Sequence, residues 1–144
     1  MSAELDIARQ WIAKAKNDIL DADNNLAAKR IPCDMVCFHC QQAVEKLLKA
    51  VLSAKGVPPP RTHDLLALLE MVLPFAPQLE DLRDCLVILT PYSVASRYPD
   101  DDGVNIPSLE DAKEARQCAN RVLNLLVNQF PDVFNLMPRN FNPG

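Results

Sequence analysis

Hydrophobic residues recur every three or four positions along most of the chain, which is the pattern of amphipathic helices. The first such stripe predicts one long helix over residues 3–28, and its members are Ala8, Trp11, Ile12, Ala15, Ile19, Ala22 and Leu26. The polar residues between them are expected on the solvated face of that helix: Lys14, Lys16, Asp18, Asp21 and Asp23. Ile31-Pro32 then interrupts the pattern.

A second stripe predicts a helix over residues 34–55, with Asp34 as its N-cap. Its members are Val36, Cys40, Ala43, Val44, Leu47, Val51 and Leu52. Gly56 fits the C′ position, and three prolines at 58–60 prevent continuation. A polar set shares one side of this helix and is expected to face a bundle neighbour or a second subunit: Gln41, Gln42, Glu45 and Lys49.

Shorter helical patterns follow. Thr62 is expected to cap a third helix that runs through Leu73, and a fourth is predicted over residues 78–90. Residues 91–107 show no helical period, and a loop of that length inside a compact domain is often functional. Ser108 and Asp111 resemble a capping box that opens a fifth helix ending near residue 130.

These elements predict an all-α, up-and-down antiparallel bundle of about five helices over residues 1–130, followed by an extended tail over 131–144. The chain of 144 residues is long enough for one domain with a real core. It has 3 glycines against 12 prolines and no glycine-rich phosphate loop, which argues against dinucleotide-binding and P-loop folds.

Targeting signals are not evident in the sequence. The N-terminal stretch is acidic and has no long apolar run, so we expect neither a signal peptide nor a membrane span. Five cysteines, an odd number, favour free thiols and a cytoplasmic location.

Three of the cysteines form the most conspicuous local pattern, Cys33-x3-Cys37-x2-Cys40, whose spacing coincides with the cluster-binding signature of radical SAM enzymes. Cys37 and Cys40 lie inside a predicted helix on its apolar side, where a thiol packs as a small hydrophobic group. We therefore predict no metal and no cofactor. Cys85 and Cys118 are likewise expected in or near the core.

Basic residues are concentrated around the second helix. Residues 29–61 carry a net charge of +4, although the whole chain carries −4. Lys46 and Lys49 could therefore bind a polyanion or a nucleotide, or they could form an ordinary solvated face.

Two further groups are candidates for phosphate binding. His63 stands at the start of the third helix, where it could bind phosphate together with the helix N-terminus or serve as a local cap. Arg97 offers a planar fork for phosphate and Tyr98 a ring that can stack on a base, although Arg97 could instead pair with an acidic neighbour in its loop. No nucleophilic triad is evident around either histidine.

The block QQAVEKLLKA at 41–50, followed by Gly56, THDL at 62–65 and RYP at 97–99, resembles the HEPN domain (higher eukaryotes and prokaryotes nucleotide-binding). The resemblance covers about residues 5–130. It implies a helical bundle that is usually a homodimer. Many prokaryotic members act with a minimal nucleotidyltransferase partner, as in toxin–antitoxin pairs, and some are toxins that cleave RNA without a metal.

Those ribonucleases use an arginine and a histidine separated by four to six residues. Here eight residues separate Arg30 from His39 and one residue separates Arg61 from His63, so the motif is absent. We therefore expect a non-catalytic module that binds an ATP- or GTP-like nucleotide, or RNA phosphates, through Lys46, Lys49, His63, Arg97 and Tyr98. The alternatives are a metal-independent endoribonuclease and a purely structural dimerisation bundle.

Overall fold

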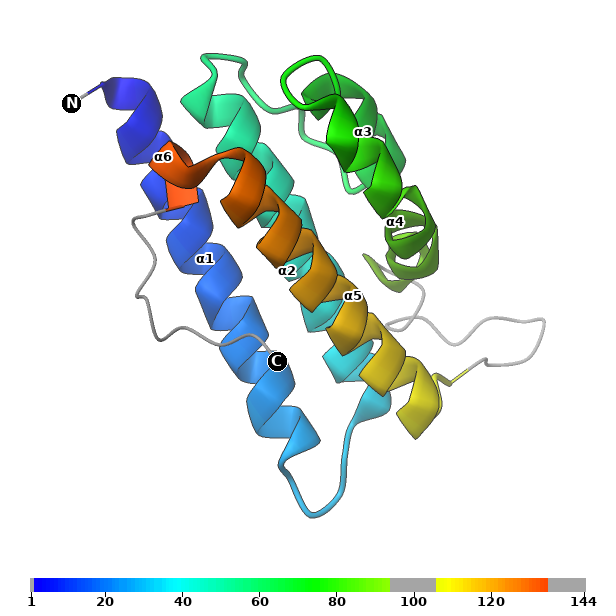
Figure 1. Ribbon diagram of the computed structural model, residues 1–144. Helices are drawn as coiled ribbons and strands as arrows, with labels where there is room; N and C mark the ends of the chain where they lie inside the picture. Colours follow the sequence, from blue (N-terminus) through cyan, green and yellow to red (C-terminus); the bar gives the residue numbers. More distant parts are fainter. Residues whose placement is uncertain (1, 94–105, 135–144) are drawn as a thin grey trace.

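The computed structural model of the protein describes residues 2–93 and 106–134. All the regular elements in these residues are helical (Figure 1). In chain order they are α1 (Ala3–Leu26), α2 (Cys33–Ala54), α3 (Leu65–Val72), the 3-10 helix η1 (Pro77–Leu82), α4 (Arg83–Leu89), the 3-10 helix η2 (Thr90–Ser93), α5 (Leu109–Gln129) and α6 (Pro131–Phe134). The all-α bundle predicted from the sequence is confirmed.

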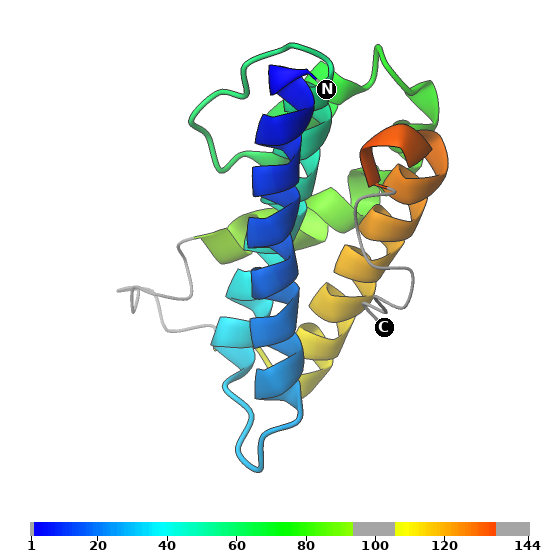
Figure 2. The same ribbon diagram turned by 90° about the vertical axis from the view of Figure 1, so that its left-hand side faces the viewer.

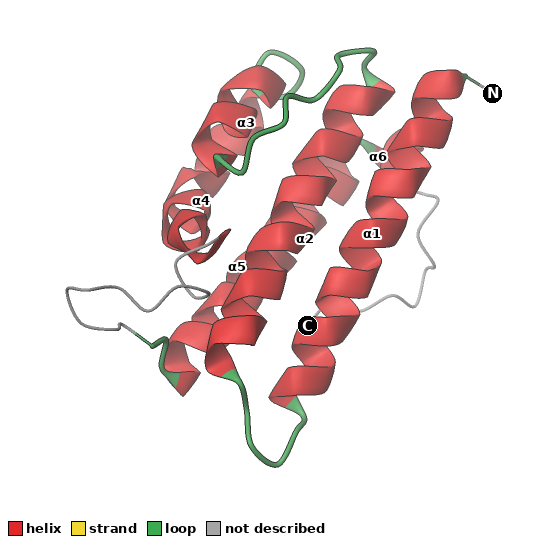
Figure 3. Ribbon diagram, turned by 180° about the vertical axis from the view of Figure 1, so that it is seen from behind, coloured by secondary structure: helices red, strands yellow, loops and turns green. Residues whose placement is uncertain are grey.

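Helix α2 is the centre of the bundle. It packs against α1 on one side and α3 on the other, and α5 lies along both α2 and the short α4 (Figures 1 and 3). In the view from the α1 side, α1 lies in front of α2, and α5 runs beside them (Figure 2). Leu47, Leu48 and Leu52 of α2 are fully buried. Helix α2 therefore contributes large buried side chains to the core that it shares with α1, α3 and α5.

The predicted apolar stripe of α1 is buried at Ala8, Ile12, Ala15, Ile19 and Ala22. Ser2 caps the helix by accepting a hydrogen bond from the backbone N–H of Leu5 at 3.2 Å. One expectation for this helix is wrong: Asp18 is buried against α2 instead of facing solvent. It follows Ala15 by three positions and precedes Ala22 by four, so it lies at the edge of the buried stripe.

The sequence predicts Asp34 as the N-cap of α2 and Gly56 as its C′ residue. Asp34 is not the N-cap, because Pro32 occupies that position and Asp34 lies in the first turn, where its carboxylate accepts from the Met35 N–H at 2.9 Å. At the other end Gly56 has φ +76°, as the C′ position requires. Val57 N–H donates to the Leu52 carbonyl at 2.9 Å and Gly56 N–H to that of Ser53 at 3.1 Å, which is a Schellman motif.

The cap of α3 is Asp64 and not Thr62. The Asp64 carboxylate accepts from the N–H groups of Leu66 and Ala67 at 3.0 and 3.2 Å. The Thr62 hydroxyl accepts from Asp64 N–H at 3.1 Å, one step earlier in the chain. Aspartate is a stronger helix cap than threonine, which accounts for the shift.

The second half of the bundle departs from the sequence prediction at the start of the fourth helix and after α5. The expected fourth helix begins as the 3-10 helix η1, whose first residue is Pro77, and becomes α-helical only at Arg83.

The predicted capping box of α5 is confirmed, with Ser108 and Asp111 bonded reciprocally at 2.9 and 3.1 Å. After α5 the chain is not extended at first, because α6 buries Val133 and Phe134 against the core.

The rest of the predicted tail, residues 135–144, lies outside the described residues, as does most of the loop at 91–107. Among the helices that are described, none combines the length and apolar character needed to cross a membrane.

Candidate functional site

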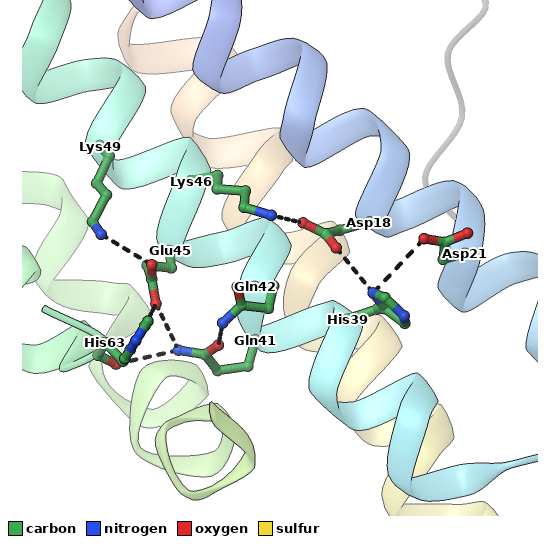
Figure 4. A network of polar contacts seen from close by, with 9 residues as sticks. All are labelled: Asp18, Asp21, His39, Gln41, Gln42, Glu45, Lys46, Lys49 and His63. Carbon is green, nitrogen blue, oxygen red and sulfur yellow. Dashed lines mark hydrogen bonds and ion pairs between the residues drawn. The ribbon is translucent and has the colours of Figure 1, made fainter. Parts of the chain in front are cut away.

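A network of polar side chains runs along one side of α2 (Figure 4). Its core is Gln41, Glu45 and Lys49, which are spaced one helical turn apart and are all buried. Lys49 Nζ donates to Glu45 Oε2 at 3.0 Å, and Gln41 Nε2 donates to Glu45 Oε1 at 3.3 Å. The prediction that this polar side faces a bundle neighbour is confirmed, since the neighbours are α1 and the segment before α3.

His63 joins this network from the connection between α2 and α3. Its Nδ1 atom lies 2.8 Å from Glu45 Oε1, and its backbone carbonyl accepts from Gln41 Nε2 at 3.2 Å. The His63 side chain is 62% exposed, whereas that of Glu45 is only 4% exposed. An exposed imidazole is thus attached at one nitrogen to a buried carboxylate.

Burial of the Glu45 carboxylate is possible because its charge is compensated. Lys49 supplies an ammonium group that is itself almost fully buried and lies 5.5 Å from the centroid of the Trp11 ring of α1. An ion pair removed from water needs such close partners and further hydrogen bonds to be tolerated. Trp11, Lys49, Glu45 and His63 therefore form one continuous arrangement from α1 to the α3 end of the molecule.

A second polar cluster lies between α1 and α2, on another side of α2 (Figure 4). His39 Nδ1 lies 2.9 Å from Asp18 Oδ1 and 3.9 Å from Asp21 Oδ2. Lys46 Nζ contacts the other carboxylate oxygen of Asp18. The buried Asp18 therefore lies between a histidine and a lysine, both contributed by α2.

The two lysines proposed from the sequence are thus engaged inside the protein. Lys46 is paired with Asp18, and Lys49 with Glu45. Phosphate binding by either lysine would require its ammonium to exchange a carboxylate partner. The exposed basic residues of this region lie instead in the connections at the two ends of α2: Lys29 and Arg30 at one end, Lys55 and Arg61 at the other.

The N-terminus of α3 does not offer the anion site considered from the sequence. Asp64 already occupies the N–H groups of Leu66 and Ala67, so a phosphate there would have to displace a negatively charged cap. His63 stands beside this cap and contacts Glu45 instead. Arg97 and Tyr98 lie outside the described residues.

The cysteines behave as the sequence predicted. Cys37, Cys40, Cys85 and Cys118 are all buried and free. Burial raises the pKa of both Cys37 and Cys40 to about 12. The prediction that these thiols pack as small hydrophobic groups in the core is confirmed by their burial.

The sequence pattern does not group Asp18, Asp21 and His39. The signal that was available is the position of Asp18 three and four residues from buried alanines. Nothing in the helical period identifies His39, 21 residues away on another helix, as its partner. Similarly, the period places Glu45 on the correct side of α2 but does not identify His63 as the residue it meets.

Comparison with known proteins agrees with this architecture. The family model for the HEPN domain matches residues 8–130. The chain is also similar to a solved structure, the crystal structure of TT1696 from Thermus thermophilus, with a TM-score of 0.73 and 26% sequence identity. That similarity covers 85% of this chain and 97% of the other. No curated protein matches the chain.

The matched range contains α2, the Glu45–His63 contact and the whole of α5. It extends over most of the chain, so the resemblance drawn from the motifs at 41–50 and 62–65 is confirmed. The chain belongs to the HEPN domain family.

Proposed function

We propose that this HEPN domain binds a nucleotide, or the phosphates of RNA, at the surface around His63, and that it does so without catalysing a reaction. The observation that carries the proposal is the His63–Glu45 contact: an exposed imidazole held at Nδ1 by a buried carboxylate. The second ring nitrogen, Nε2, is then available to donate a hydrogen bond to a phosphate oxygen when the ring is protonated.

Neighbouring groups support an anionic ligand at this place. Arg61 is exposed and stands two residues before His63. Arginine is suited to phosphate because its guanidinium donates two parallel hydrogen bonds. In this proposal Arg97 and Tyr98 add a second phosphate contact and a stacking surface for a base.

The two lysines take different parts in this proposal. Lys49 acts through Glu45, because it neutralises the carboxylate that fixes His63. Lys46 is paired with Asp18, so in this proposal it reaches a phosphate only by exchanging that carboxylate for the ligand. We further propose that the protein acts as a cytoplasmic homodimer together with a minimal nucleotidyltransferase, as the family membership suggests.

A binding experiment with matched variants tests this proposal. Purified protein is titrated with ATP, GTP and a short fluorescent RNA, and thermal midpoints are recorded in parallel. We expect a ligand-dependent rise of the midpoint that His63→Ala and Arg97→Ala each reduce. Lys14→Ala removes an exposed charge from α1 and serves as the control that leaves affinity unchanged. Saturable binding that survives both His63→Ala and Arg97→Ala would refute the site.

A second candidate, a metal-independent endoribonuclease, is favoured by the same contact. An imidazole oriented by a carboxylate is the usual arrangement of a general acid–base. This candidate predicts cleavage of RNA in the presence of a chelator, abolished by His63→Ala. Binding without cleavage favours the first proposal. If the protein neither binds nor cleaves at millimolar ligand, the result favours the third alternative, a structural dimerisation bundle.

A further inference from the structure

The side chains of Asp18, Asp21 and His39 converge on one point between α1 and α2 (Figure 4). One donor atom from each lies within 4.8 Å of the other two. The three donors are two carboxylate oxygens and the imidazole Nδ1, and they come from two helices that are packed along their length. The three side chains are separate from the Glu45–His63 contact that carries the function proposed above.

Hydrogen bonding alone does not account for this convergence. The Nδ1 atom carries at most one proton and can donate it to one carboxylate. The shorter contact, 2.9 Å to Asp18, uses that capacity, and the contact to Asp21 at 3.9 Å is too long for a hydrogen bond. At 3.9 Å the contact to Asp21 is at most a weak ion pair, so the Asp21 carboxylate keeps free lone pairs beside the other two donor atoms.

The net negative charge of the cluster favours a bound cation. Asp18 and Asp21 carry two negative charges, and Lys46 supplies one positive charge. Lys46 contacts Oδ2 of Asp18, so Oδ1, the oxygen nearer to His39, is the one that faces the point of convergence. Lys46 thereby fixes the orientation of the Asp18 carboxylate without occupying that oxygen.

We propose that Asp18, Asp21 and His39 form a binding site for a divalent transition-metal cation such as Zn²⁺ or Co²⁺. One imidazole nitrogen with two carboxylate oxygens is a donor set that first-row divalent ions accept. The ion replaces the proton that Nδ1 shares with Asp18, and that proton moves to Nε2 or to solvent. Bonds of about 2.0–2.2 Å let such an ion bridge donors up to about 4.4 Å apart. The three donor atoms lie within 4.8 Å of one another, so a small side-chain adjustment is enough to close the site, and the 56% exposed Asp21 is able to make it. Water completes the coordination.

The test is a titration of the full chain with Co²⁺ and with Zn²⁺, followed by calorimetry and by visible absorption of bound Co²⁺. We expect saturable binding of one metal ion per chain. The visible spectrum of bound Co²⁺ should be typical of nitrogen and oxygen ligands. Asp21→Asn should weaken the affinity at least about tenfold, because it removes a charged ligand. This variant changes an exposed side chain, so it tests the site without threatening the fold.

Asp6→Asn is the matched control. It makes the same substitution on the same helix at a side chain that is 58% exposed, and it should leave the affinity unchanged. His39→Gln, checked for its fold by circular dichroism, should also weaken binding. Any one of three results overturns the proposal. The first is no saturable binding at millimolar metal, and the second is equal affinity in wild type and Asp21→Asn. The third is a thiolate-to-cobalt charge-transfer band, which shows that cysteines hold the ion.

Discussion

The Nδ1 atom of His63 lies 2.8 Å from Oε1 of Glu45, 18 residues earlier in the chain. The contact joins the most exposed histidine of the described chain to a side chain within the core. The backbone of the same residue is held as well, because Gln41 Nε2 donates to its carbonyl. The position of the exposed ring is therefore set by buried residues of α2, which is how proteins preorganise a binding group.

Replacing Glu45 tests how strongly the core depends on this network. Glu45→Ala leaves the buried ammonium of Lys49 without its carboxylate partner, and we expect a loss of about 3–5 kcal/mol in the free energy of unfolding. Urea denaturation followed by circular dichroism measures it. Glu80→Ala is the control, since Glu80 pairs with Arg83 on the surface and should matter much less. Equal losses in the two variants would contradict the assignment.

Ser53 provides a test with the opposite sign. Its side chain is buried in α2, and its Oγ atom makes no hydrogen bond within the described part of the chain. Ser53→Ala removes an unsatisfied hydroxyl and should stabilise the protein by about 1 kcal/mol. Thermal unfolding gives the difference. Thr90→Val is the contrasting variant, because the Thr90 hydroxyl donates to the Leu86 carbonyl at 2.6 Å and its loss should be destabilising.

Gly56 tests the C-terminal end of α2. A methyl group added there would meet nothing within 4 Å, so any cost of Gly56→Ala comes from the backbone, which has φ +76°. We expect a loss of about 1–2 kcal/mol. Gly56→Asn should cost less, since asparagine tolerates the left-handed region. Chemical denaturation of the three proteins in parallel would show whether this order holds; the reverse order would exclude a backbone origin.

Buried thiols predict a loss of stability in alkali. Burial raises the pKa of Cys37 from 9.0 to about 12 in the folded protein. Above pH 9 the unfolded chain releases this proton while the folded chain retains it. Stability is thus complete below that pH and declines as the pH rises toward 12, by up to about 1.4 kcal/mol per unit.

Urea titrations at about pH 8 and about pH 10 measure this slope. Cys37→Ala should reduce the slope by the part that one thiol contributes, whatever the cavity costs at neutral pH, and Cys40, whose pKa is also raised to about 12, keeps its own part. Val36→Ala removes a neighbouring, equally buried side chain that carries no titrating group, and it should keep the wild-type slope. If the slopes of the two variants coincide, the thiol is not its source.

The fold was largely predictable because it depends on helical periodicity and on caps. The apolar stripes of α1, α2 and α5 are the buried faces of the structure, and Gly56 and Ser108 mark helix ends as expected. The errors are local choices between similar signals. Asp64 competes with Thr62 for one cap, and Pro77 starts a 3-10 turn where the period alone reads as an α-helix.

The candidate sites were less predictable, because they depend on which helices meet. A period of 3.6 residues assigns Lys49 to a polar side of α2, but solvent and a buried partner give the same sequence pattern. Only the packing of α1 and of the α2–α3 connection shows that Lys49 lies between Trp11 and Glu45. The same holds for His39, whose partner Asp18 is defined by the register of α1 against α2.

The packing of α1 along α2 also has a consequence for how the chain folds. These helices are neighbours in sequence and are joined by a short turn, so their contact closes a small loop and costs little chain entropy. Arg116 of α5 reaches Asp23 of α1 across 93 residues, with Nε 2.7 Å from Oδ1. We therefore expect the α1–α2 hairpin to form first on the folding pathway and α5 to dock onto it afterwards, with Arg116 joining the two in the final step.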